Sequence, residues 1–207
     1  MGRMIGSSSI SFDKPPFIIE GASIVGQKEG DGPLGKLFDV VEQDPMLGQE
    51  TWEEAESLLQ KEAIQKLLFK AGMSKEEIRY IFGGDLLGQL IATTFGILEF
   101  EVPFFGLYGA CSTMGEALSL GAVMVEAGNA DNVIAMASSH FASAERQFRF
   151  PLAYGNQRPY AATWTVTGCG AVIISTKKGF AKITGITTGK IVDFGVKDAQ
   201  NMGACMA

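Results

Sequence analysis

The sequence predicts an α/β fold in which a mostly parallel central sheet is covered by helices. Short, continuous apolar runs such as residues 132–137 are typical of strands that are covered on both faces. Helical patterns separate these runs, most clearly over residues 51–72. Strands that alternate with helices favour parallel pairing, because a crossover must return the chain to the same edge of the sheet.

Composition narrows the function classes before any motif does. The chain has 207 residues, 46% of them hydrophobic, which is enough to bury a substantial core. A net charge of −6 and the absence of any basic run exclude nucleic acid as the expected partner. Every apolar stretch is interrupted before the roughly 18 residues that a membrane-spanning helix needs, and there is no basic-then-apolar secretory signal. We therefore expect a soluble, cytoplasmic protein.

Cysteine and histidine are too few for a disulfide framework or a zinc site. The three cysteines, Cys111, Cys169 and Cys205, are odd in number and lack CxxC spacing, which fits a reducing compartment. The chain holds a single histidine, His140, so we expect no metal site.

The first elements follow from their patterns. Residues 1–12 are polar and rich in Gly and Ser, and we expect a mobile lead-in there. Residues 17–26 form an apolar run closed by glycine, which predicts the first strand. Residues 27–48 carry Gly, Pro and Asp and predict a long surface excursion, a length that is uncommon in compact domains unless it serves a function.

Two capping patterns come next. Thr51 and Glu54 form a capping-box pattern for a helix that ends at Gly72, and residues 74–77 repeat this pattern for a short turn. Residues 80–82 predict a strand that is stopped by two glycines. Asp85 follows as the expected N-cap of an apolar helix that reaches residue 98.

The second half of the chain continues the alternation. An apolar, strand-like run over residues 102–108 leads into Cys111 and a helix of small residues that Gly128 closes. The strand over residues 132–137 ends at Ser138–His140. A long segment over residues 141–164 mixes arginines and aromatics, and an apolar strand over 171–174 precedes a strand pair within 181–192.

Cys111 is the leading candidate for chemistry, because it stands where a strand gives way to a helix. Free N–H groups and the positive end of the helix dipole stabilise a thiolate at such a junction. Its neighbours Gly109, Ala110 and Ser112 are small and leave room for a ligand. The alternative is a small buried side chain that ends a core strand, which is the usual role of a free cysteine.

Three polar residues are expected at the carboxyl ends of strands, where ligands collect in α/β sheets: Asp85, Cys111 and His140. Cys111 and His140 together would suit a thiol nucleophile and its base. The alternatives are that His140 is satisfied by Ser139 or a backbone carbonyl, and that Asp85 is a helix cap. The arginines after His140, such as Arg149 and Arg158, would suit a small aromatic carboxylate through bidentate pairing and stacking.

The residues also carry a family resemblance. The run 109–118 around Cys111, with the capped helix before it and the apolar run after residue 126, resembles the first half of a thiolase-like fold. The stretches 163–168 and 192–204 narrow the resemblance from this broad fold to a single family. Over nearly its whole length the chain is similar to the stage V sporulation protein AD family of spore-forming Firmicutes, whereas the cysteine motif alone is shared with ketoacyl synthases and thiolases.

The resemblance implies a function and a site. It implies a sporulation protein that binds dipicolinic acid, with calcium, and supports uptake of this acid into the developing spore. The partners would be dipicolinic acid itself and other stage V sporulation membrane proteins, at a place peripheral to the spore inner membrane. The ligand would occupy the pocket that a thiolase uses for its acyl substrate. Cys111 matches the family's nucleophile position.

Three functions stay open. In the binding hypothesis, backbone N–H groups near Ser112 and an arginine such as Arg149 or Arg158 would bind the carboxylates of dipicolinic acid. Cys111 would line the pocket without reacting. In the enzyme reading, Cys111 would attack an acyl thioester carried by coenzyme A, as in a thiolase or ketoacyl synthase. One histidine is too few for the usual version of that reaction, so binding is favoured. A structural adaptor for membrane partners is the third reading.

The resemblance further implies a fold of two similar halves, of which the second pseudo-repeat is largely missing here. We expect residues 1–176 to form the first thiolase-like half and residues 177–207 to start the second. Cys205 would lie in that short stub and is not the family's second cysteine. A face that should pack on a second half would expose apolar surface, so we expect a homodimer.

Overall fold

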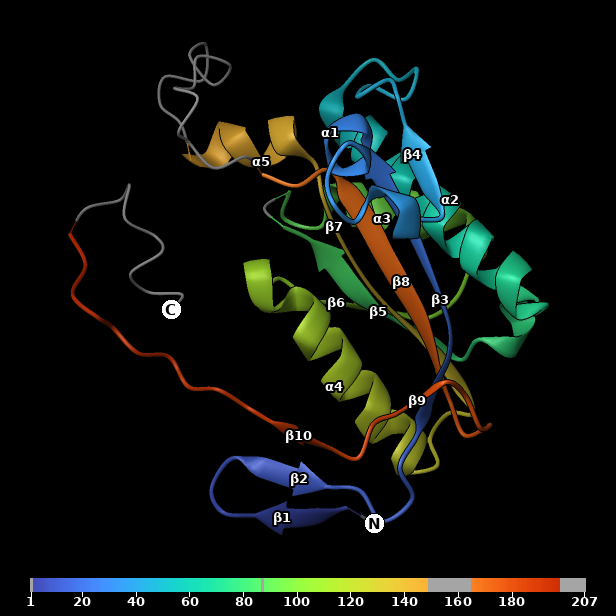
Figure 1. The fold of residues 1–207 in the computed structure, drawn as a ribbon. Helices are drawn as coiled ribbons and strands as arrows, with labels where there is room; N and C mark the ends of the chain where they lie inside the picture. Colours follow the sequence, from blue (N-terminus) through green and yellow to red (C-terminus); the bar gives the residue numbers. More distant parts are fainter. Residues whose placement is uncertain (1, 87, 149–164, 198–207) are drawn as a thin grey trace.

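The computed structural model describes residues 2–86, 88–148 and 165–197 and shows a helix-covered sheet with a small second sheet beside it (Figure 1). The main sheet has seven strands, with six in the order β4-β3-β8-β7-β5-β6 and β9 paired on β3. Its strands are β3 (Phe17–Gly26), β4 (Val40–Glu42), β5 (Tyr80–Asp85), β6 (Phe104–Gly106), β7 (Asn132–Ser139), β8 (Gly168–Ser175) and β9 (Ala181–Lys182).

Strand directions confirm the mostly parallel sheet. The pairs β3/β4, β5/β6 and β5/β7 are parallel. Strand β8 lies between β3 and β7 and is antiparallel to both, so β3 and β7 themselves run in the same direction. Five strands therefore point one way and their carboxyl ends meet at one edge, where an α/β sheet forms its crevice.

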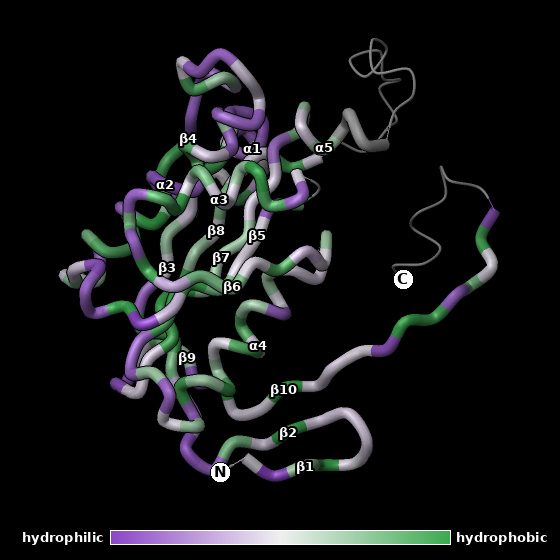
Figure 2. Tube along the Cα trace, turned by 180° about the vertical axis from the view of Figure 1, so that it is seen from behind, coloured by the Kyte–Doolittle hydropathy of each residue, from purple (hydrophilic) through white to green (hydrophobic). Residues whose placement is uncertain are grey.

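The two faces of the sheet are covered by different helices. Helices α2 (Trp52–Ala71) and α3 (Ile91–Ile97) share one core cluster with Ile81, Ile134 and Ile173. Helix α4 (Thr113–Glu126) shares the other cluster with Phe82 and Ile174, which are the next residues along their strands. Side chains alternate between the two faces of a strand, so both faces are buried. Figure 2 shows hydrophilic stretches mainly in the outer loops.

Helix α2 begins and ends where its sequence predicts. The Thr51 hydroxyl accepts a hydrogen bond from Glu54 N at 3.2 Å, and the Glu54 carboxylate accepts one from Thr51 N at 3.0 Å. Gly72 ends the helix in the left-handed region, at φ 61°, where glycine carries no steric penalty. The predicted turn after residue 74 is the 3₁₀ helix η2 (Lys75–Glu77).

The prediction that two glycines stop β5 is wrong. The strand continues through Gly83 and Gly84 and ends at Asp85. A Cβ on Gly84 would lie 2.0 Å from the Leu107 carbonyl oxygen, so glycine is needed here for close approach of a neighbouring segment. The strand end is thereby moved to Asp85, and helix α3 starts only after Leu90.

The N-terminal segment and the region after β8 also differ from expectation. Strands β1 (Arg3–Ile5) and β2 (Ser9–Ser11) form a hairpin in place of the mobile lead-in. The two strands expected within 181–192 are present as β9 and β10 (Gly185–Thr187), but β10 pairs with β2 and β9 pairs with β3, so they do not pair with each other. Pairing partners that are distant in sequence leave no local signal, so the sequence did not predict which strands β9 and β10 join.

The remaining connections carry short elements. The excursion over residues 27–48 contains α1 (Gln27–Gly30), the 3₁₀ helix η1 (Gly35–Leu37) and β4. The 3₁₀ helices η3 (Leu98–Phe100) and η4 (Ala110–Ser112) follow α3 and precede α4. The segment after His140 opens with helix α5 (Phe141–Phe148), which its mixture of aromatics and arginines did not reveal.

Candidate functional site

The carboxyl ends of β5 and β7 and the start of α4 form the candidate site. Strand β5 ends at Asp85, β7 ends at Ser139 next to His140, and α4 is preceded by the turn that holds Cys111. The topology therefore brings the three predicted residues to the same edge of the sheet. Their surroundings differ, and these differences decide what each can do.

Cys111 is exposed in the 3₁₀ turn that precedes α4. Ala110 beside it has φ 49°, a backbone conformation that non-glycine residues rarely adopt. The N–H groups of Ser112 and Thr113 already donate to the Gly109 and Ala110 carbonyls. Stabilisation of a thiolate or a ligand carboxylate at this turn therefore depends on the helix dipole and on later amides of α4.

Ser112 links the cysteine turn to an acidic side chain. Its hydroxyl donates to the Gly109 carbonyl at 2.8 Å and also lies within hydrogen-bond distance of the Glu116 carboxylate. Ser112 and Glu116 are both exposed. An anion that approaches Cys111 therefore meets a negative charge one helical turn away, which a bound cation would offset.

Asp85 is fully buried and acts on α3. Its carboxylate accepts hydrogen bonds from Leu90 N at 3.2 Å, Thr93 N at 3.2 Å and the Thr93 hydroxyl at 2.9 Å. The prediction that Asp85 is the N-cap residue of the helix is wrong, because Leu90 is the residue that directly precedes α3. The carboxylate nevertheless satisfies amides at the start of α3 from the end of β5, which is the work of a cap.

His140 is also fully buried, and both of its ring nitrogens have partners. Nε2 lies 2.8 Å from the Pro45 carbonyl oxygen and therefore donates, and Nδ1 accepts from Ala142 N at 3.2 Å. The Trp52 and Phe141 rings pack against the imidazole at 5.2 and 5.0 Å between centroids. Burial lowers the pKa of His140, which keeps the ring neutral.

The structure does not join His140 to Cys111. Among the described residues, no hydrogen bond connects the two side chains, and His140 is held by the loop before α2. Cys169 is buried in β8, and its burial raises the pKa of the thiol, which keeps it protonated. Arg149, Arg158 and Cys205 lie outside the described residues.

A buried polar network under this edge was missed by the sequence reasoning. It joins side chains from α2, α3, β5, β7 and α5: Glu56, Gln60, Asp85, Thr93, Ser138 and Ser143. Glu56 and Gln60 are four residues apart on α2 and therefore share one face of the helix. The buried residues Ala55 and Leu59 lie on the same face. Two polar residues inside an apolar stripe are the signal that could have found it.

Glu56 is the central group of this network. Its Oε1 accepts from the Ser138 hydroxyl at 2.8 Å, and its Oε2 accepts from the Ser143 hydroxyl at 2.7 Å. The side chain is 1% exposed. Desolvation, with a smaller contribution from Asp85, raises the pKa of Glu56 from 4.5 to about 7, against the lowering effect of the two serine hydrogen bonds.

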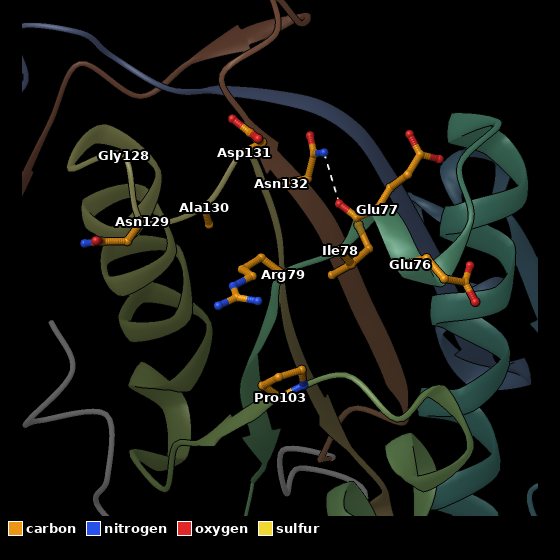
Figure 3. Close-up of a pocket in the computed structure, with 10 residues that line it drawn as sticks. All are labelled: Glu76, Glu77, Ile78, Arg79, Pro103, Gly128, Asn129, Ala130, Asp131 and Asn132. Carbon is orange, nitrogen blue, oxygen red and sulfur yellow. Dashed lines mark hydrogen bonds between the residues drawn. The ribbon is translucent and has the colours of Figure 1, made fainter.

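A cavity of about 580 Å³ lies elsewhere, at the amino ends of the strands. It is lined by residues that precede or begin β5, β6 and β7, including Arg79, Pro103 and Asn132. Figure 3 shows the Arg79 guanidinium between Pro103 and Asn129, and the Asn132 amide donating to the Glu77 carbonyl at 3.1 Å. This cavity is at the opposite end of the sheet from Cys111.

The described part of the chain lacks two features, a metal-binding cluster and a membrane-spanning helix. No three side chains of His, Cys, Asp and Glu stand close enough to hold a metal ion there. No described helix has the length and apolar character needed to cross a membrane.

Comparison with known proteins identifies the family. The family model described as stage V sporulation protein AD matches residues 6–207. The chain is 40% identical over 205 residues to stage V sporulation protein AD of Bacillus subtilis (strain 168), covering 99% of this chain and 61% of that protein. The chain thus spans less than two thirds of the length of this relative.

Solved structures confirm the fold. The chain is similar to 3-oxoacyl-[acyl-carrier-protein] synthase III from Aquifex aeolicus VF5, with a TM-score of 0.51 and 18% identity, over 77% of this chain and 53% of that one. It is also similar to the priming β-ketosynthase of the R1128 polyketide pathway, with a TM-score of 0.50 and 17% identity, over 84% and 52%. At such identities only the thiolase-like fold is shared, and the sequence matches carry the assignment: the chain belongs to the stage V sporulation protein AD family.

Proposed function

We propose that this sporulation protein binds dipicolinic acid, together with calcium, in its thiolase-like site and supports uptake of the acid into the developing spore without catalysis. The observation that carries the absence of catalysis is the environment of His140. Both ring nitrogens are engaged by backbone groups, so the imidazole offers no free lone pair to the Cys111 thiol. Among the described residues Cys111 therefore has no histidine base, and in this proposal it lines the site without turning over an acyl substrate.

The described residues divide into two roles in this proposal. Cys111 and Ser112 are exposed and would touch the ligand. Asp85 and His140 are fully buried and would shape the floor by holding the start of α3 and the loop before α2. Arg149 and Arg158 are proposed to pair with the ligand carboxylates, since a guanidinium matches a carboxylate in bidentate geometry.

The exposed carboxylate of Glu116 beside Ser112 supports a role for calcium. A dicarboxylate that approaches Ser112 meets Glu116, whose carboxylate is hydrogen-bonded to that serine. Calcium prefers carboxylate oxygens and would link the ligand to this side chain while it offsets the repulsion. The proposal therefore expects calcium to strengthen binding and Glu116→Gln to remove that gain.

The alternative is an acyltransferase of the thiolase or ketoacyl synthase type that works through Cys111 and coenzyme A thioesters. The exposed Cys111 at the start of α4 favours it, because the helix dipole supports a nucleophilic thiolate. Such an enzyme would need a base and an oxyanion site from other parts of a full-length protein.

Calorimetric titration tests the two functions. The chain, and a version extended to the full length of the family, are titrated with dipicolinate and with acetyl-coenzyme A, each with and without calcium. Saturable dipicolinate binding without coenzyme A binding supports the proposal, and binding by the extended version alone shows that both halves form the site. Acetylation of Cys111, read by mass spectrometry, would establish the acyltransferase instead.

Cys111→Ala and protection from alkylation locate the ligand. If the variant keeps full affinity, and dipicolinate does not protect Cys111 from iodoacetamide, the ligand binds elsewhere.

We further propose that stage V membrane proteins are the partners, at the inner membrane of the spore, and that the chain forms a homodimer. Pull-down of those proteins from spore membranes, compared between the wild type and a surface variant of α4, tests the partner assignment.

A further inference from the structure

The directions of the hydrogen bonds in the buried network fix a donor for one carboxyl oxygen of Glu56, Oε1, and leave the other, Oε2, free to carry a proton. Asp85 accepts from the Thr93 hydroxyl, so that hydroxyl cannot also donate to Gln60. The Gln60 amide therefore turns its NH₂ group to Thr93, at 3.0 Å, and donates to the Ser138 oxygen at 2.6 Å. Ser138 in turn donates to Glu56 Oε1.

The remaining oxygen of Glu56 faces a hydroxyl that has two acceptors. Ser143 lies 2.7 Å from Glu56 Oε2 and 3.1 Å from the His140 carbonyl oxygen. When Glu56 is protonated at Oε2, it donates to Ser143, and Ser143 donates to His140. When Glu56 loses that proton to solvent, the Ser143 hydroxyl turns and donates to the carboxylate. Every hydroxyl keeps a partner in both states, so hydrogen bonding alone does not hold Glu56 in one state, and the cost of ionisation is the cost of its buried charge.

The ionised state places a second carboxylate beside Asp85. Among residues 2–86, 88–144 and 165–197, the ionisable groups that face Glu56 are Glu53 on its own helix, Asp85 at the end of β5 and Cys169 on β8, and His140 is joined to it through Ser143. None of them is a cation at neutral pH. Among the side chains that the structure describes, which on α5 end at residue 144, no lysine or arginine pairs with Glu56. The amides of Phe141 and Ala142 are already used by Thr167 and His140 and do not offset the charge.

Helix α5 is the element that this charge would release. Its first turn is held to the body of the protein by Ser143 on Glu56, by the Phe141 amide on Thr167, and by ring packing on Trp52. We infer that Glu56 and Ser143 form a proton-controlled latch, which docks α5 on α2 while Glu56 is protonated and releases it when Glu56 ionises. Water then reaches the carboxylate, and this relieves the cost of a buried charge.

The latch is adjacent to the candidate site, because α5 follows His140 directly. Its effect on ligand binding rests on the proposed function: an anionic ligand would bind more weakly once Glu56 is ionised. The burial that raises the pKa of Glu56 to about 7 places the change in the neutral range. His140, whose pKa is lowered, would titrate only at more acidic pH.

Hydrogen exchange of the α5 amides between pH 4.5 and 8 tests the latch without any ligand. For release coupled to one proton, the opening constant rises about tenfold for each pH unit between pH 4.5 and about 7, and it levels off above 7, where Glu56 is ionised in the docked state as well. We expect this rise in the wild type and in the exposed control Glu101→Gln, and its loss in Glu56→Gln, which cannot ionise but can form the same hydrogen bonds. Comparison at equal pH cancels the intrinsic pH dependence of exchange.

Trp52 fluorescence gives a second readout, in a Trp164→Phe background that leaves Trp52 as the only tryptophan. A change with a midpoint near pH 7 that disappears in Glu56→Gln supports the latch, and the same change in His140→Gln excludes the histidine as its source. A wild type whose α5 protection is the same as that of Glu56→Gln at every pH would overturn it. Dipicolinate titration at the same pH values separates the two ideas: no binding at any pH refutes the proposed function, while the exchange result still decides the latch.

Discussion

At the scale of the residue, burial decides the role of each titratable group. Glu56 and His140 stand within the same buried region, yet their pKa values shift in opposite directions, because burial disfavours the charged form of both an acid and a base. The two described cysteines differ in exposure, since Cys111 is exposed and Cys169 is buried in the sheet, where burial raises the pKa of its thiol. Residue type alone does not contain this information.

The first residue-scale prediction concerns stability and pH. The folded pKa of Glu56 lies above its unfolded value, so the folded chain holds an extra proton between pH 4.5 and about 7. Stability from this group is complete below pH 4.5 and is lost as pH rises through about 7. We expect Glu56→Gln to gain about 3 kcal/mol relative to the wild type between pH 4 and pH 8, measured by urea unfolding at each pH.

Titration of His140 does not affect the difference in stability between the wild type and Glu56→Gln. Its pKa is lowered, so its contribution to stability is complete above the ordinary value near 6.5 and is lost as pH falls below that value. Both proteins carry His140, and its effect cancels in their difference. An identical pH dependence of the wild type and Glu56→Gln would contradict the prediction.

The second residue-scale prediction concerns thiol reactivity. In a Cys205→Ser background, native iodoacetamide labelling should modify Cys111 at least roughly tenfold faster than Cys169, because Cys169 is buried and its thiol stays protonated. Peptide mass spectrometry measures the two rates, and labelling in urea is the control that should equalise them. Equal rates in the native state would show that Cys169 is accessible.

At the scale of the element, ends are set by different forces. The start of α2 is encoded locally, since Thr51 and Glu54 are three residues apart and satisfy each other's backbone groups. The end of β5 is set from a distance, because the Leu107 carbonyl oxygen approaches Gly84 and excludes any side chain. Local patterns therefore predict the first boundary and mislead at the second.

A pair of glycine substitutions tests this account. Gly84→Ala would place a methyl group against backbone that cannot move away, and we expect a loss of about 2–3 kcal/mol. Gly115→Ala, on α4 where nothing lies within 4 Å of the new Cβ, should gain about 0.5–1 kcal/mol from helix propensity. Thermal and urea unfolding measure both, and a neutral Gly84→Ala would refute the close approach.

At the scale of the whole molecule, apolar side chains are exposed on both helix layers, with Phe69 and Phe95 on the side of α2 and α3. On α4 the side chain of Leu120 is 43% exposed, and near the strands of this side Phe105 and Tyr108 are exposed as well. The segment after β10 leads away from the main sheet, and Ile191 and Phe194 on it are exposed (Figure 1). Apolar surface of this kind favours association.

We therefore predict self-association through α4. Sedimentation velocity over a range of concentrations should show a monomer–dimer equilibrium, and Leu120→Glu should weaken it by about tenfold or more, because a charge would be buried at the contact. Phe69→Glu on α2 is the matched control, since it removes an exposed apolar side chain from the other side of the sheet and should change nothing. Equal effects of the two variants would refute the assignment to α4.

The sequence by itself determined the alternation of strands and helices, the capped ends of α2, the strands β3, β7 and β8, and the junction that holds Cys111, because these features depend on periodicity and on neighbours a few residues away. Only the tertiary structure decided the antiparallel place of β8, the pairing of β10 with β2, and the partners of His140 and Glu56. Those features depend on contacts between residues that are distant in the chain. Packing sets both the burial and the hydrogen bonds on which the chemistry of the site rests.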